Sequence, residues 1–487
     1  MQIRTRIAPS PTGFVHIGTL HTALFNYFFT RQNGGKFVIR IEDTDRERLV
    51  EGAVENLLES LAVFGIENDE GPFIDSNGVI DEKGDFGPYT QSARLDIYKP
   101  YVQQLVLQGD AYYCFCTRER LDEMRKAQQA IKQTPKYDRA CCKLDNAEVK
   151  ARIDAGEAHV VRMKVPEGET TFTDLIRGTI KINNKEIDDQ VILKSDGFPT
   201  YHLAVVVDDF LMQITHIIRG EEWLPSAPKH VILYKMLGFE LPKFAHVPLL
   251  LNPDKTKLSK RQGDVAVEDY VKRGYLPDAL INFVGTLGFN PSADKEIFTR
   301  TELTKLFDLS KVNKSGAVMN MEKLDWMNRE YMRLLSIDEL AEAARSFVQA
   351  DVESEPVRRA LVVERERVHR LDELQEAIDP YLIEPAYDPS MLVWKKADSA
   401  DAKLQLDGIR GFIQALDDAT IESVEKIEAE ARAYIDANEL QNGNVLWPMR
   451  VALSGHEKSA SPFEFLWALG KGAALQRIDK AIGMLNK

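Results

Sequence analysis

Apolar residues near the start of the chain switch from strand spacing to helix spacing and back. Ile3 to Ala8 is a short strand-like run, which the turn residues Pro9 to Gly13 end. Apolar positions then recur at helical spacing from Ile17 to Phe28, and Gly34-Gly35 supply a stop. Phe37 to Ile41 is a second, β-branched run. This order predicts a βαβ unit, and hence a parallel sheet with a ligand site at the carboxyl ends of its strands.

The pattern changes between about 101 and 200. A basic helix is expected from Arg118 to Gln133, followed by alternating segments such as His159 to Val165 and Thr179 to Ile182. Strand and helix signals then return at Ile214 to Arg219 and at Ala227 to Leu237. The middle segment therefore reads as an α+β insertion in the α/β domain.

Strand signals fade from about residue 270, and long helical periodicities follow. The predicted fold is thus an α/β Rossmann-like domain with an α+β insertion, followed by an all-α region. At roughly 150 residues per domain, a chain of 487 residues is expected to form three or four units.

Composition narrows the class of protein. No stretch resembles a signal peptide or a membrane span, so we expect a cytoplasmic location. A net charge of −14 argues against coating of nucleic acid by bulk electrostatics. Local basic patches can still bind RNA, because the screening length at physiological salt is about 8 Å.

The turn before the first helix is a candidate phosphate site. The chain contains no complete glycine-rich nucleotide motif, but the Pro9 to Gly18 segment aims a helix N-terminus and His16 at one point. Gly18 allows a ligand to approach the first helical turn. The alternative is a rigid turn that carries a surface histidine.

A second cluster is the basic loop Lys257-Leu258-Ser259-Lys260-Arg261. Mobile lysines that reach the phosphates only in the transition state accelerate phosphoryl chemistry, and Lys260 is the first choice for that contact. A solvated surface loop is the alternative.

In this order, on either side of an insertion, the two clusters resemble the nucleotide-binding signatures of class I aminoacyl-tRNA synthetases. The glutamyl-tRNA synthetase family is resembled further at Arg6 to Gly13, Arg40 to Asp45, Pro199 to His202, Val207 to Asp209 and Ile218 to Trp223. The resemblance covers essentially the whole chain and is most specific through about residue 265. It implies a glutamate–tRNA ligase that uses ATP with Mg²⁺, L-glutamate and tRNA(Glu), acts as a monomer and binds no membrane.

The resemblance also implies a domain plan. The catalytic domain is expected at 1–100 and 201–265, interrupted by a connective, acceptor-arm-binding insertion at 101–200. A stem-contact region at 266–330 and an anticodon-binding region at 331–487 follow.

Glutamate carries one ammonium and two carboxylates, which suit particular side chains. Arg6 and Arg219 offer planar forks for the carboxylates, and Glu42 offers an anion for the ammonium. Which arginine takes which carboxylate stays open, with Arg6 favoured for the side chain. The alternative is an ordinary ion-pair network of Arg40, Glu42, Asp43 and Asp45 at a strand end.

The family resemblance supplies further site residues. It implies glutamate contacts at Arg6, Ala8, Ser10, Glu42, Tyr201 and Arg219, whereas Val205 stands where some relatives carry Asn. It implies ATP contacts at Pro9, Ser10, Thr12, His16, Gly18, Glu222, Trp223, Leu250, Leu251, Lys257, Ser259 and Lys260. Among these, His16, Gly18, Lys257 and Lys260 are assigned to catalysis.

Contacts with tRNA are implied at Arg118, Lys126 and Arg139 in the insertion and at Arg367, Arg450 and Ser459 near the C-terminus. Arg367 matches an arginine that reads the last anticodon base. Cys114, Cys116 and Cys141 resemble the zinc site of some members, but Lys143 replaces the expected histidine. Cys142 is the candidate substitute, although adjacent residues seldom both aim at one tetrahedral ion.

Other functions are also compatible with parts of the sequence. A ligase that also charges tRNA(Gln), or the shorter relative that glutamylates a modified tRNA base, would keep the fold and change the acceptor. A small-molecule nucleotidyltransferase of the same catalytic fold has no need of a helical C-terminal third. A non-catalytic RNA-binding paralogue is disfavoured by the intact His16, Gly18, Lys257 and Lys260.

Overall fold

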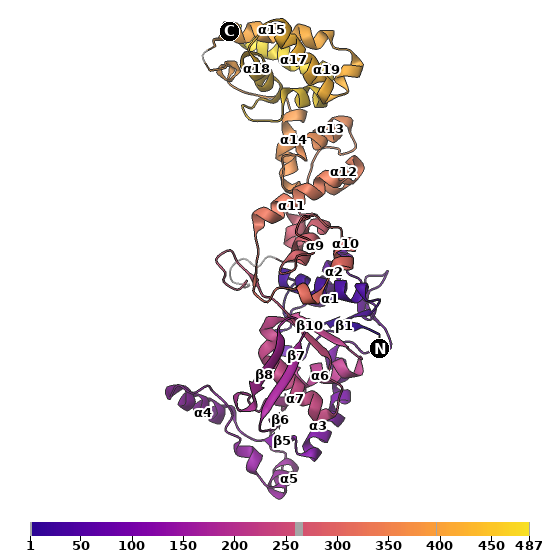
Figure 1. Ribbon diagram of the computed structural model, residues 1–487, viewed down its shortest axis with the longest axis vertical. Coiled ribbons are helices and arrows are strands. Elements are labelled where there is room, and N and C mark those ends of the chain that lie inside the picture. The colour runs from indigo at the N-terminus through magenta and orange to yellow at the C-terminus, as the bar shows by residue number, and fades with distance from the viewer. Residues whose placement is uncertain (1, 259–265, 396, 487) are drawn as a thin grey trace. The chain divides into compact units, whose positions relative to one another are not determined.

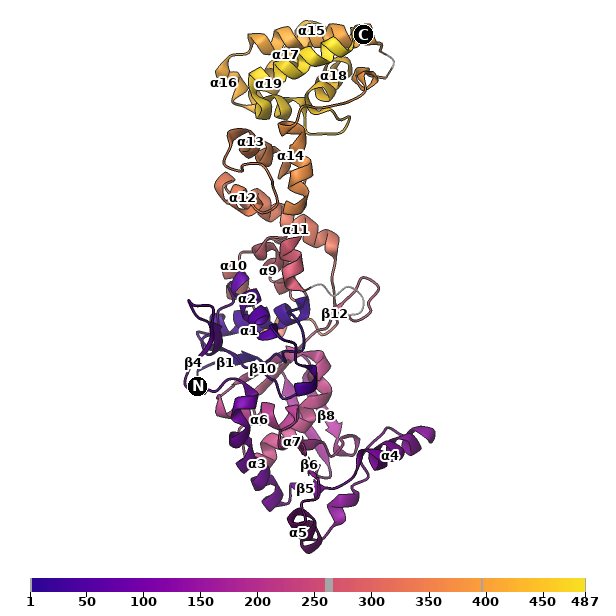
Figure 2. The same cartoon turned by 180° about the vertical axis from the view of Figure 1, so that it is seen from behind.

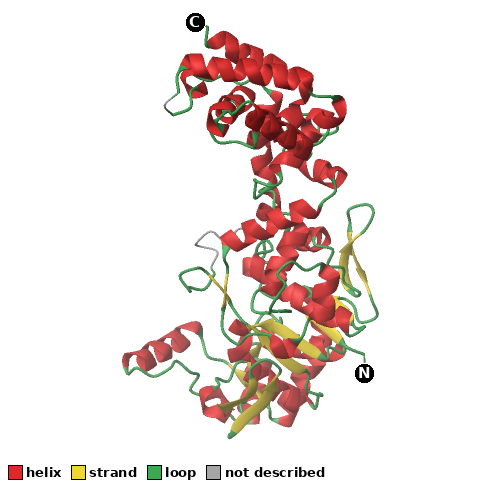
Figure 3. Cartoon of the chain, turned by 45° about the horizontal axis from the view of Figure 1, so that its top comes forward, coloured by secondary structure: helices red, strands yellow, loops and turns green. Residues whose placement is uncertain are grey.

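The computed structural model describes residues 2–258, 266–395 and 397–486. It divides into two compact units, Met1–Tyr270 with Leu280–Asn320, and Val271–Ala279 with Met321–Lys487. Strands gather in the first unit, whereas the described part of the second contains only helices (Figure 3). No described helix combines the length and the apolar character that crossing a membrane requires.

The first unit contains the expected βαβ element. Strands β1 (Arg4–Ile7) and β2 (Lys36–Ile39) are parallel, and helix α1 (Ile17–Gln32) connects them (Figure 1). Strand β10 (His216–Gly220) lies beside β1, where the Thr215 N–H donates to the Arg4 carbonyl at 3.0 Å. Strand β11 (Lys243–Val247) pairs with β10 in parallel. The carboxyl ends of these strands therefore share one edge, as the sequence predicts.

The segment between the two parts of this sheet forms two substructures. Strands β5 (Ala111–Cys114), β6 (Val160–Met163) and β9 (Val191–Leu193) make an antiparallel sheet. Strands β7 (Glu169–Asp174) and β8 (Gly178–Asn183) form a hairpin, and β7 also pairs with β11 in parallel. Part of the predicted insertion thus extends the catalytic sheet.

The helices of this segment bear the basic residues. Helix α4 (Arg118–Ala130) ends before the predicted Gln133, and α5 is Asn146–Asp154. In the views from both sides, α4 lies away from the strands (Figures 1 and 2).

Helices α3 (Leu95–Gln108), α6 (Tyr201–Leu211) and α7 (Ala227–Leu237) pack together around an apolar cluster that includes Tyr98, Leu203 and Leu233. Helix α7 has the predicted bounds. The remaining α-helices and strands of the first unit are α2 (Ala53–Val63), the hairpin β3 (Gly71–Ile74) and β4 (Ile80–Lys83), the pair β12 (Leu250–Leu251) and β13 (Ala317–Val318), and α10 (Arg300–Leu306). Helices α8 (Val267–Lys272) and α9 (Pro277–Thr286) both span the division.

The second unit confirms the all-α prediction for the described part of 331–487. Its helices surround a separate apolar core, which includes Leu361, Ile409, Met449 and Phe465. They are α11 (Met321–Leu334), α12 (Ile337–Ala344), α13 (Glu355–Glu364), α14 (Leu374–Leu382), α15 (Ser399–Ala415), α16 (Asp418–Ile421), α17 (Val424–Ala437), α18 (Asn442–Ser454) and α19 (Pro462–Met484).

Candidate active site

A cavity of about 420 Å³ opens at the carboxyl ends of β1 and β10. Its lining brings together most of the residues that the sequence proposed for glutamate and ATP. They are Arg6, Ala8, Pro9, Ser10, Thr12, His16, Gly18, Glu42, Tyr201, Arg219, Glu222, Trp223, Leu250 and Lys257. Leu251 does not line the cavity, and Ser259 and Lys260 lie outside the described residues.

His16 begins helix α1 as its N-cap. Its ring Nδ1 accepts from the backbone N–H groups of Gly18 at 3.1 Å and Thr19 at 3.3 Å. Nδ1 therefore carries no proton, and the ring proton of the neutral form sits on Nε2, which lies 3.3 Å from the Thr19 hydroxyl. A Cβ on residue 18 would stand 3.1 Å from the His16 ring, which favours glycine there. The positive end of α1 at the cavity suits a phosphate.

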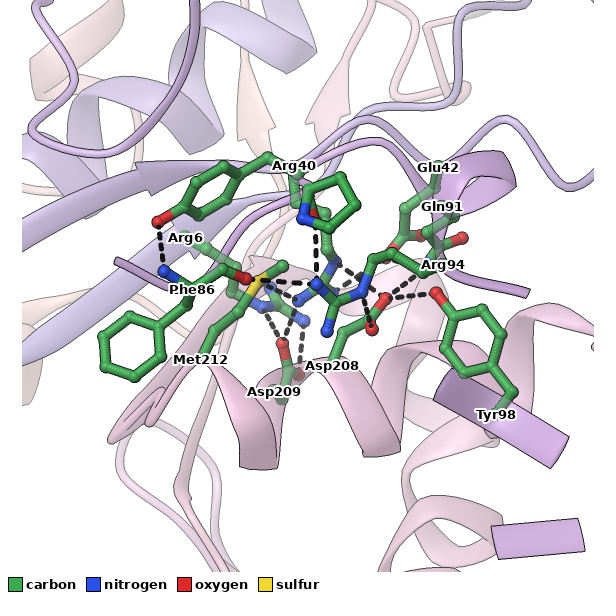
Figure 4. Close-up of polar contacts among 12 residues, drawn as sticks. Arg6, Arg40, Glu42, Phe86, Gln91, Arg94, Tyr98, Asp208, Asp209 and Met212 are labelled. Carbon is green, nitrogen blue, oxygen red and sulfur yellow. Dashed lines mark hydrogen bonds and ion pairs between the residues drawn. The ribbon is translucent and has the colours of Figure 1, made fainter. Parts of the chain in front are cut away.

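Arg6 is held by a buried carboxylate from α6. Its Nε and Nη2 donate to the two carboxylate oxygens of Asp209 at 3.0 and 3.1 Å (Figure 4). Arg40 donates to the same carboxylate at 2.7 Å and to Glu42 at 2.9 Å. Burial acts to raise the pKa of Asp209, but Arg6 and Arg40 outweigh it and hold that pKa below its ordinary value. These ion pairs fix the side of the cavity that Arg6 and Glu42 line.

Asp208 anchors the other end of this network. It accepts from Arg94 Nε at 2.7 Å, Gln91 Nε2 at 2.9 Å and the Tyr98 hydroxyl at 2.9 Å (Figure 4). Its neighbour in sequence, Asp209, faces Arg6 and Arg40. The two adjacent carboxylates thus connect α6 to β1, β2 and the start of α3.

The ion-pair network that the sequence offered as an alternative at the end of this strand is only partly present. Arg40 and Glu42 do form an ion pair at 2.9 Å. Asp43 instead accepts from the Ser92 backbone N–H, and Asp45 pairs with Arg48 at the surface. The other carboxylates that pair with Arg40 belong to α6, which is far along the chain. No local sequence pattern could therefore have identified them.

Arg219 is buried without a carboxylate partner among the described residues. It donates to Tyr201 Oη at 3.0 Å, to His246 Nε2 at 3.1 Å and to the Trp223 carbonyl at 3.4 Å. His230, 3.4 Å from Nη1, adds no compensating charge, and burial lowers its pKa well below the ordinary value. A buried guanidinium that meets only neutral groups strongly favours an anionic ligand.

The wall next to Arg219 is aromatic. The rings of Tyr201 and Trp223 lie 4.7 Å apart, and Trp223 is 40% exposed although it lines the cavity. An accessible indole suits stacking of a planar base. Val205, where some relatives carry Asn, is 1% exposed and packs in the apolar cluster of α3, α6 and α7. Val205 does not line the cavity.

Comparisons with known proteins agree along the whole chain. Residues 2–326 match the family described as tRNA synthetases class I (E and Q), catalytic domain, and residues 339–482 match an anticodon binding domain. The glutamate–tRNA ligase of Clostridioides difficile is 44% identical over 98% of both chains. This chain belongs to the glutamate–tRNA ligase family. The ligase of Chloroherpeton thalassium is 45% identical over 99% of this chain and 98% of its own.

Solved structures of glutamate–tRNA ligases have the same fold. That of Elizabethkingia meningosepticum, described as in complex with its amino acid, has a TM-score of 0.88 at 34% identity and covers 100% of both chains. That of Elizabethkingia anophelis has a TM-score of 0.86 at 35% identity, with 99% of this chain and 100% of that chain covered.

Three of the cysteines of this chain converge. The Sγ atoms of Cys114, Cys116 and Cys141 lie within 4.8 Å of one another, whereas Cys142 is outside this group. The Tyr137 hydroxyl lies 3.4 and 3.3 Å from the first two sulfurs. Zinc–sulfur bonds of about 2.3 Å in a tetrahedron separate the sulfurs by about 3.8 Å, so the donor set fits zinc. The substitution of Cys142 for the missing histidine is not supported by this geometry.

Residues that the sequence proposed for tRNA binding fall into two groups in the structure. Arg118 and Lys126 are exposed on α4. The others are already engaged: Arg139 pairs with buried Asp189 at 2.6 Å, and Arg367 pairs with Glu464 at 2.7 Å. Arg450 donates to the Ser459 carbonyl at 2.7 Å. Arg139 thus has a structural role that the sequence did not indicate.

Proposed function

We propose that this chain activates L-glutamate with ATP to form glutamyl-adenylate and pyrophosphate, and then transfers the glutamyl group to the 3′-terminal adenosine of tRNA(Glu). The observation that carries the proposal is the buried Arg219 guanidinium, which faces the cavity with no carboxylate among its described partners. An acidic amino acid supplies the missing negative charge.

Each polar group of glutamate has a counterpart in the cavity. Tyr201 accepts from Arg219, so its own O–H remains to donate to the same carboxylate. Arg40 and Gln91 both contact Oε1 of Glu42, so Oε2 is the oxygen assigned to the ammonium. Arg6, whose Nε and Nη2 contact Asp209, retains Nη1 for the second carboxylate.

Rejection of glutamine follows from charge. Replacing the side-chain carboxylate by an amide removes the negative charge and places an NH₂ donor against donor groups. Sites built on such polar contacts discriminate by about 10⁴ to 10⁵, which removes the need for an editing domain.

Adenylation requires the α-carboxylate of glutamate to attack the α-phosphorus of MgATP, with pyrophosphate leaving. We assign the N-terminus of α1 and His16, which both line the cavity, to the phosphate oxygens. Lys257 lines the cavity, and Lys260 is assigned to the transition-state charge. The 2′-hydroxyl of the terminal adenosine then attacks the carbonyl carbon and AMP leaves. Positioning and electrostatics supply most of the acceleration.

Zinc is proposed as a structural ion in the insertion. Cys114, Cys116 and Cys141 supply three thiolates, and we assign the Tyr137 hydroxyl, 3.4 Å from Cys114 Sγ, as the fourth ligand. Arg120 Nη1 lies 3.3 Å from Cys116 Sγ and would stabilise the thiolate. A cytoplasmic location, a monomeric state and preference for tRNA(Glu) over tRNA(Gln) remain predictions from the sequence.

The test is glutamate-dependent exchange of pyrophosphate into ATP, with and without total tRNA, followed by charging of purified tRNAs. We expect exchange with glutamate and none with glutamine or aspartate. Replacing Lys260 by Ala is expected to abolish aminoacylation and to leave tRNA binding largely intact. Absence of any glutamyl ester with tRNA would contradict the proposal.

A further inference from the structure

The orientation of Arg219 depends on a histidine in the neighbouring strand. Arg219 and His246 are register partners in the parallel pair β10 and β11. Arg219 Nε–H donates to His246 Nε2 at 3.1 Å, while Nη1 donates to the Tyr201 hydroxyl at 3.0 Å. These two contacts fix the plane of the guanidinium, because they hold it at two different nitrogens.

The other nitrogen of His246 faces a carboxylate from β7. His246 Nδ1 lies 2.6 Å from Asp174 Oδ2, and the His246 backbone N–H donates to the same oxygen at 3.0 Å. The second oxygen of Asp174 accepts the backbone N–H groups of Ile176 and Arg177 at 3.0 and 2.9 Å. Three backbone donors thus hold the Asp174 side chain, which is buried, in one position.

Asp174 determines the tautomer of His246. A carboxylate only accepts, so the imidazole proton must be on Nδ1, and Nε2 then presents a lone pair to the Arg219 Nε–H. The opposite tautomer, or the protonated ring, would set two N–H donors against each other at Nε2. Burial lowers the pKa of His246, although Asp174 acts in the opposite direction, and this keeps the ring neutral.

We propose that Asp174 and His246 are positioning residues for glutamate recognition: the carboxylate fixes the imidazole tautomer, and the imidazole fixes the Arg219 guanidinium. This inference rests on the proposed function, in which Arg219 binds a glutamate carboxylate. Asp174 belongs to the segment that interrupts the catalytic domain. Glutamate recognition therefore depends on a side chain outside the two halves that line the cavity.

A pair of amide substitutions separates positioning from packing. The amide of His246→Asn reaches only the place of Nδ1, so the acceptor for Arg219 is lost. His246→Gln extends to the place of Nε2 and restores an acceptor. We expect His246→Asn to raise the KM for glutamate about tenfold to a hundredfold, as loss of a hydrogen bond to a charged group predicts, with the KM for ATP within about threefold. His246→Gln is expected to recover most of that loss.

The matched control is His216→Asn, which replaces another buried histidine of the same sheet that contacts Thr215 and the Phe29 ring. It is expected to leave the KM for glutamate unchanged. If wild-type protein shows no glutamate-dependent exchange, the proposed function fails. If wild-type protein is active and His246→Asn has the wild-type KM for glutamate, the positioning role is wrong.

The tautomer can be measured even if a variant does not fold. In wild-type protein labelled with ¹⁵N-histidine, the His246 signals, assigned by their absence in His246→Gln or by contacts with labelled neighbours, should show a protonated Nδ1 and an unprotonated Nε2. An Nε2–H tautomer or a doubly protonated ring near pH 7 would overturn the inference.

Discussion

Arg6 and Asp209 are joined by two hydrogen bonds of 3.0 and 3.1 Å, although 203 positions separate them along the chain. Both side chains are almost fully buried. The pair therefore links β1 to α6 directly beneath the cavity. Arg40 donates to the same carboxylate. Removing the Asp209 carboxylate therefore leaves two buried cations, Arg6 and Arg40, without their closest partner.

Replacing Asp209 by Asn should destabilise the first unit by about 3–5 kcal/mol, since breaking a buried ion pair leaves uncompensated charge. Urea unfolding followed by circular dichroism measures this loss. The control is Asp96→Asn, whose ion pair with Lys99 is exposed and should contribute little to stability. Equal effects of the two substitutions would contradict the assigned role of the network.

Arg219 should be required for glutamate but not for ATP. We expect Arg219→Ala to lower kcat/KM for glutamate by more than about a hundredfold, and Arg219→Lys by at least about tenfold, because lysine keeps the charge but loses the fork. ATP–pyrophosphate exchange at varied glutamate and ATP measures both constants. Arg31→Ala, which removes a pair with Asp69 outside the cavity, is the control. An unchanged glutamate KM in Arg219→Ala would contradict the recognition proposal.

The elements that the sequence predicts well are those whose signal is local. Helices α1 and α7 follow from the spacing of their apolar residues, and β1 follows from the prolines that end it. The hairpin of β3 and β4 was not predicted, because Ile80 to Lys83 shows no buried alternation.

Predictions of the candidate site have the same limit, because contacts between distant parts of the chain leave no local signal. Arg6, Glu42 and Arg219 were named from the chemistry of glutamate, yet Asp209 and His246 were given no role. Their contacts with Arg6 and Arg219 span 203 and 27 positions, so they depend on how the strands and α6 assemble. The only sequence signal for Asp209 was its place in a family motif, and His246 had none.

The cysteine cluster should bind about one zinc ion per chain, measured by elemental analysis of protein purified without added metal. We expect Cys116→Ser to lose the metal, because three thiolates surround the site. Cys142→Ser is the matched control and should retain it, since Cys142 lies outside the group. Zinc loss in Cys142→Ser with retention in Cys116→Ser would contradict the assignment.

Tyr137→Phe should weaken zinc binding without abolishing it, because the three thiolates remain. Competition with a chromophoric chelator measures the change in affinity, which is expected to be about tenfold to a hundredfold. An unchanged affinity would remove Tyr137 from the ligand set.

Arg367 should contribute to the choice of tRNA. Its guanidinium pairs with Glu464 and donates to the Val363 carbonyl, so its position in the second unit is well defined. We expect Arg367→Ala to lower kcat/KM for tRNA(Glu) about tenfold or more and to reduce the preference over tRNA(Gln), with the KM for glutamate unchanged. Arg432→Ala, on the exposed face of α17, is the control. Equal charging of both tRNAs by wild-type protein would contradict the predicted discrimination.

Acid should destabilise the first unit partly through His21. Burial lowers its pKa from 6.5 to about 4, and its Nε2–H donates to the Leu287 carbonyl at 2.9 Å. Between pH 6.5 and about pH 4 the unfolded chain binds more protons at His21 than the folded protein does. The stability that neutral His21 contributes is therefore present above pH 6.5 and is lost as the pH falls toward 4. Protonation of His21 lowers the free energy of unfolding by about 3 kcal/mol at most.

Thermal unfolding between pH 7 and pH 4 measures this dependence. His202 and His216 act in the same direction, because burial lowers their pKa values to about 3 and about 4. His21→Asn should therefore flatten the pH dependence without abolishing it. If the melting temperature falls with decreasing pH as steeply in His21→Asn as in wild-type protein, the role assigned to His21 is wrong.

His16 starts α1 with its ring Nδ1, and its side chain also lines the cavity. Under the proposed function, a single imidazole thus has two unrelated tasks, secondary-structure nucleation and contact with a nucleotide. Shorter capping residues such as Ser or Asp can begin a helix equally well, but none of them extends to the second position. Substitutions of His16 are consequently expected to combine folding defects with catalytic defects, which will be difficult to separate.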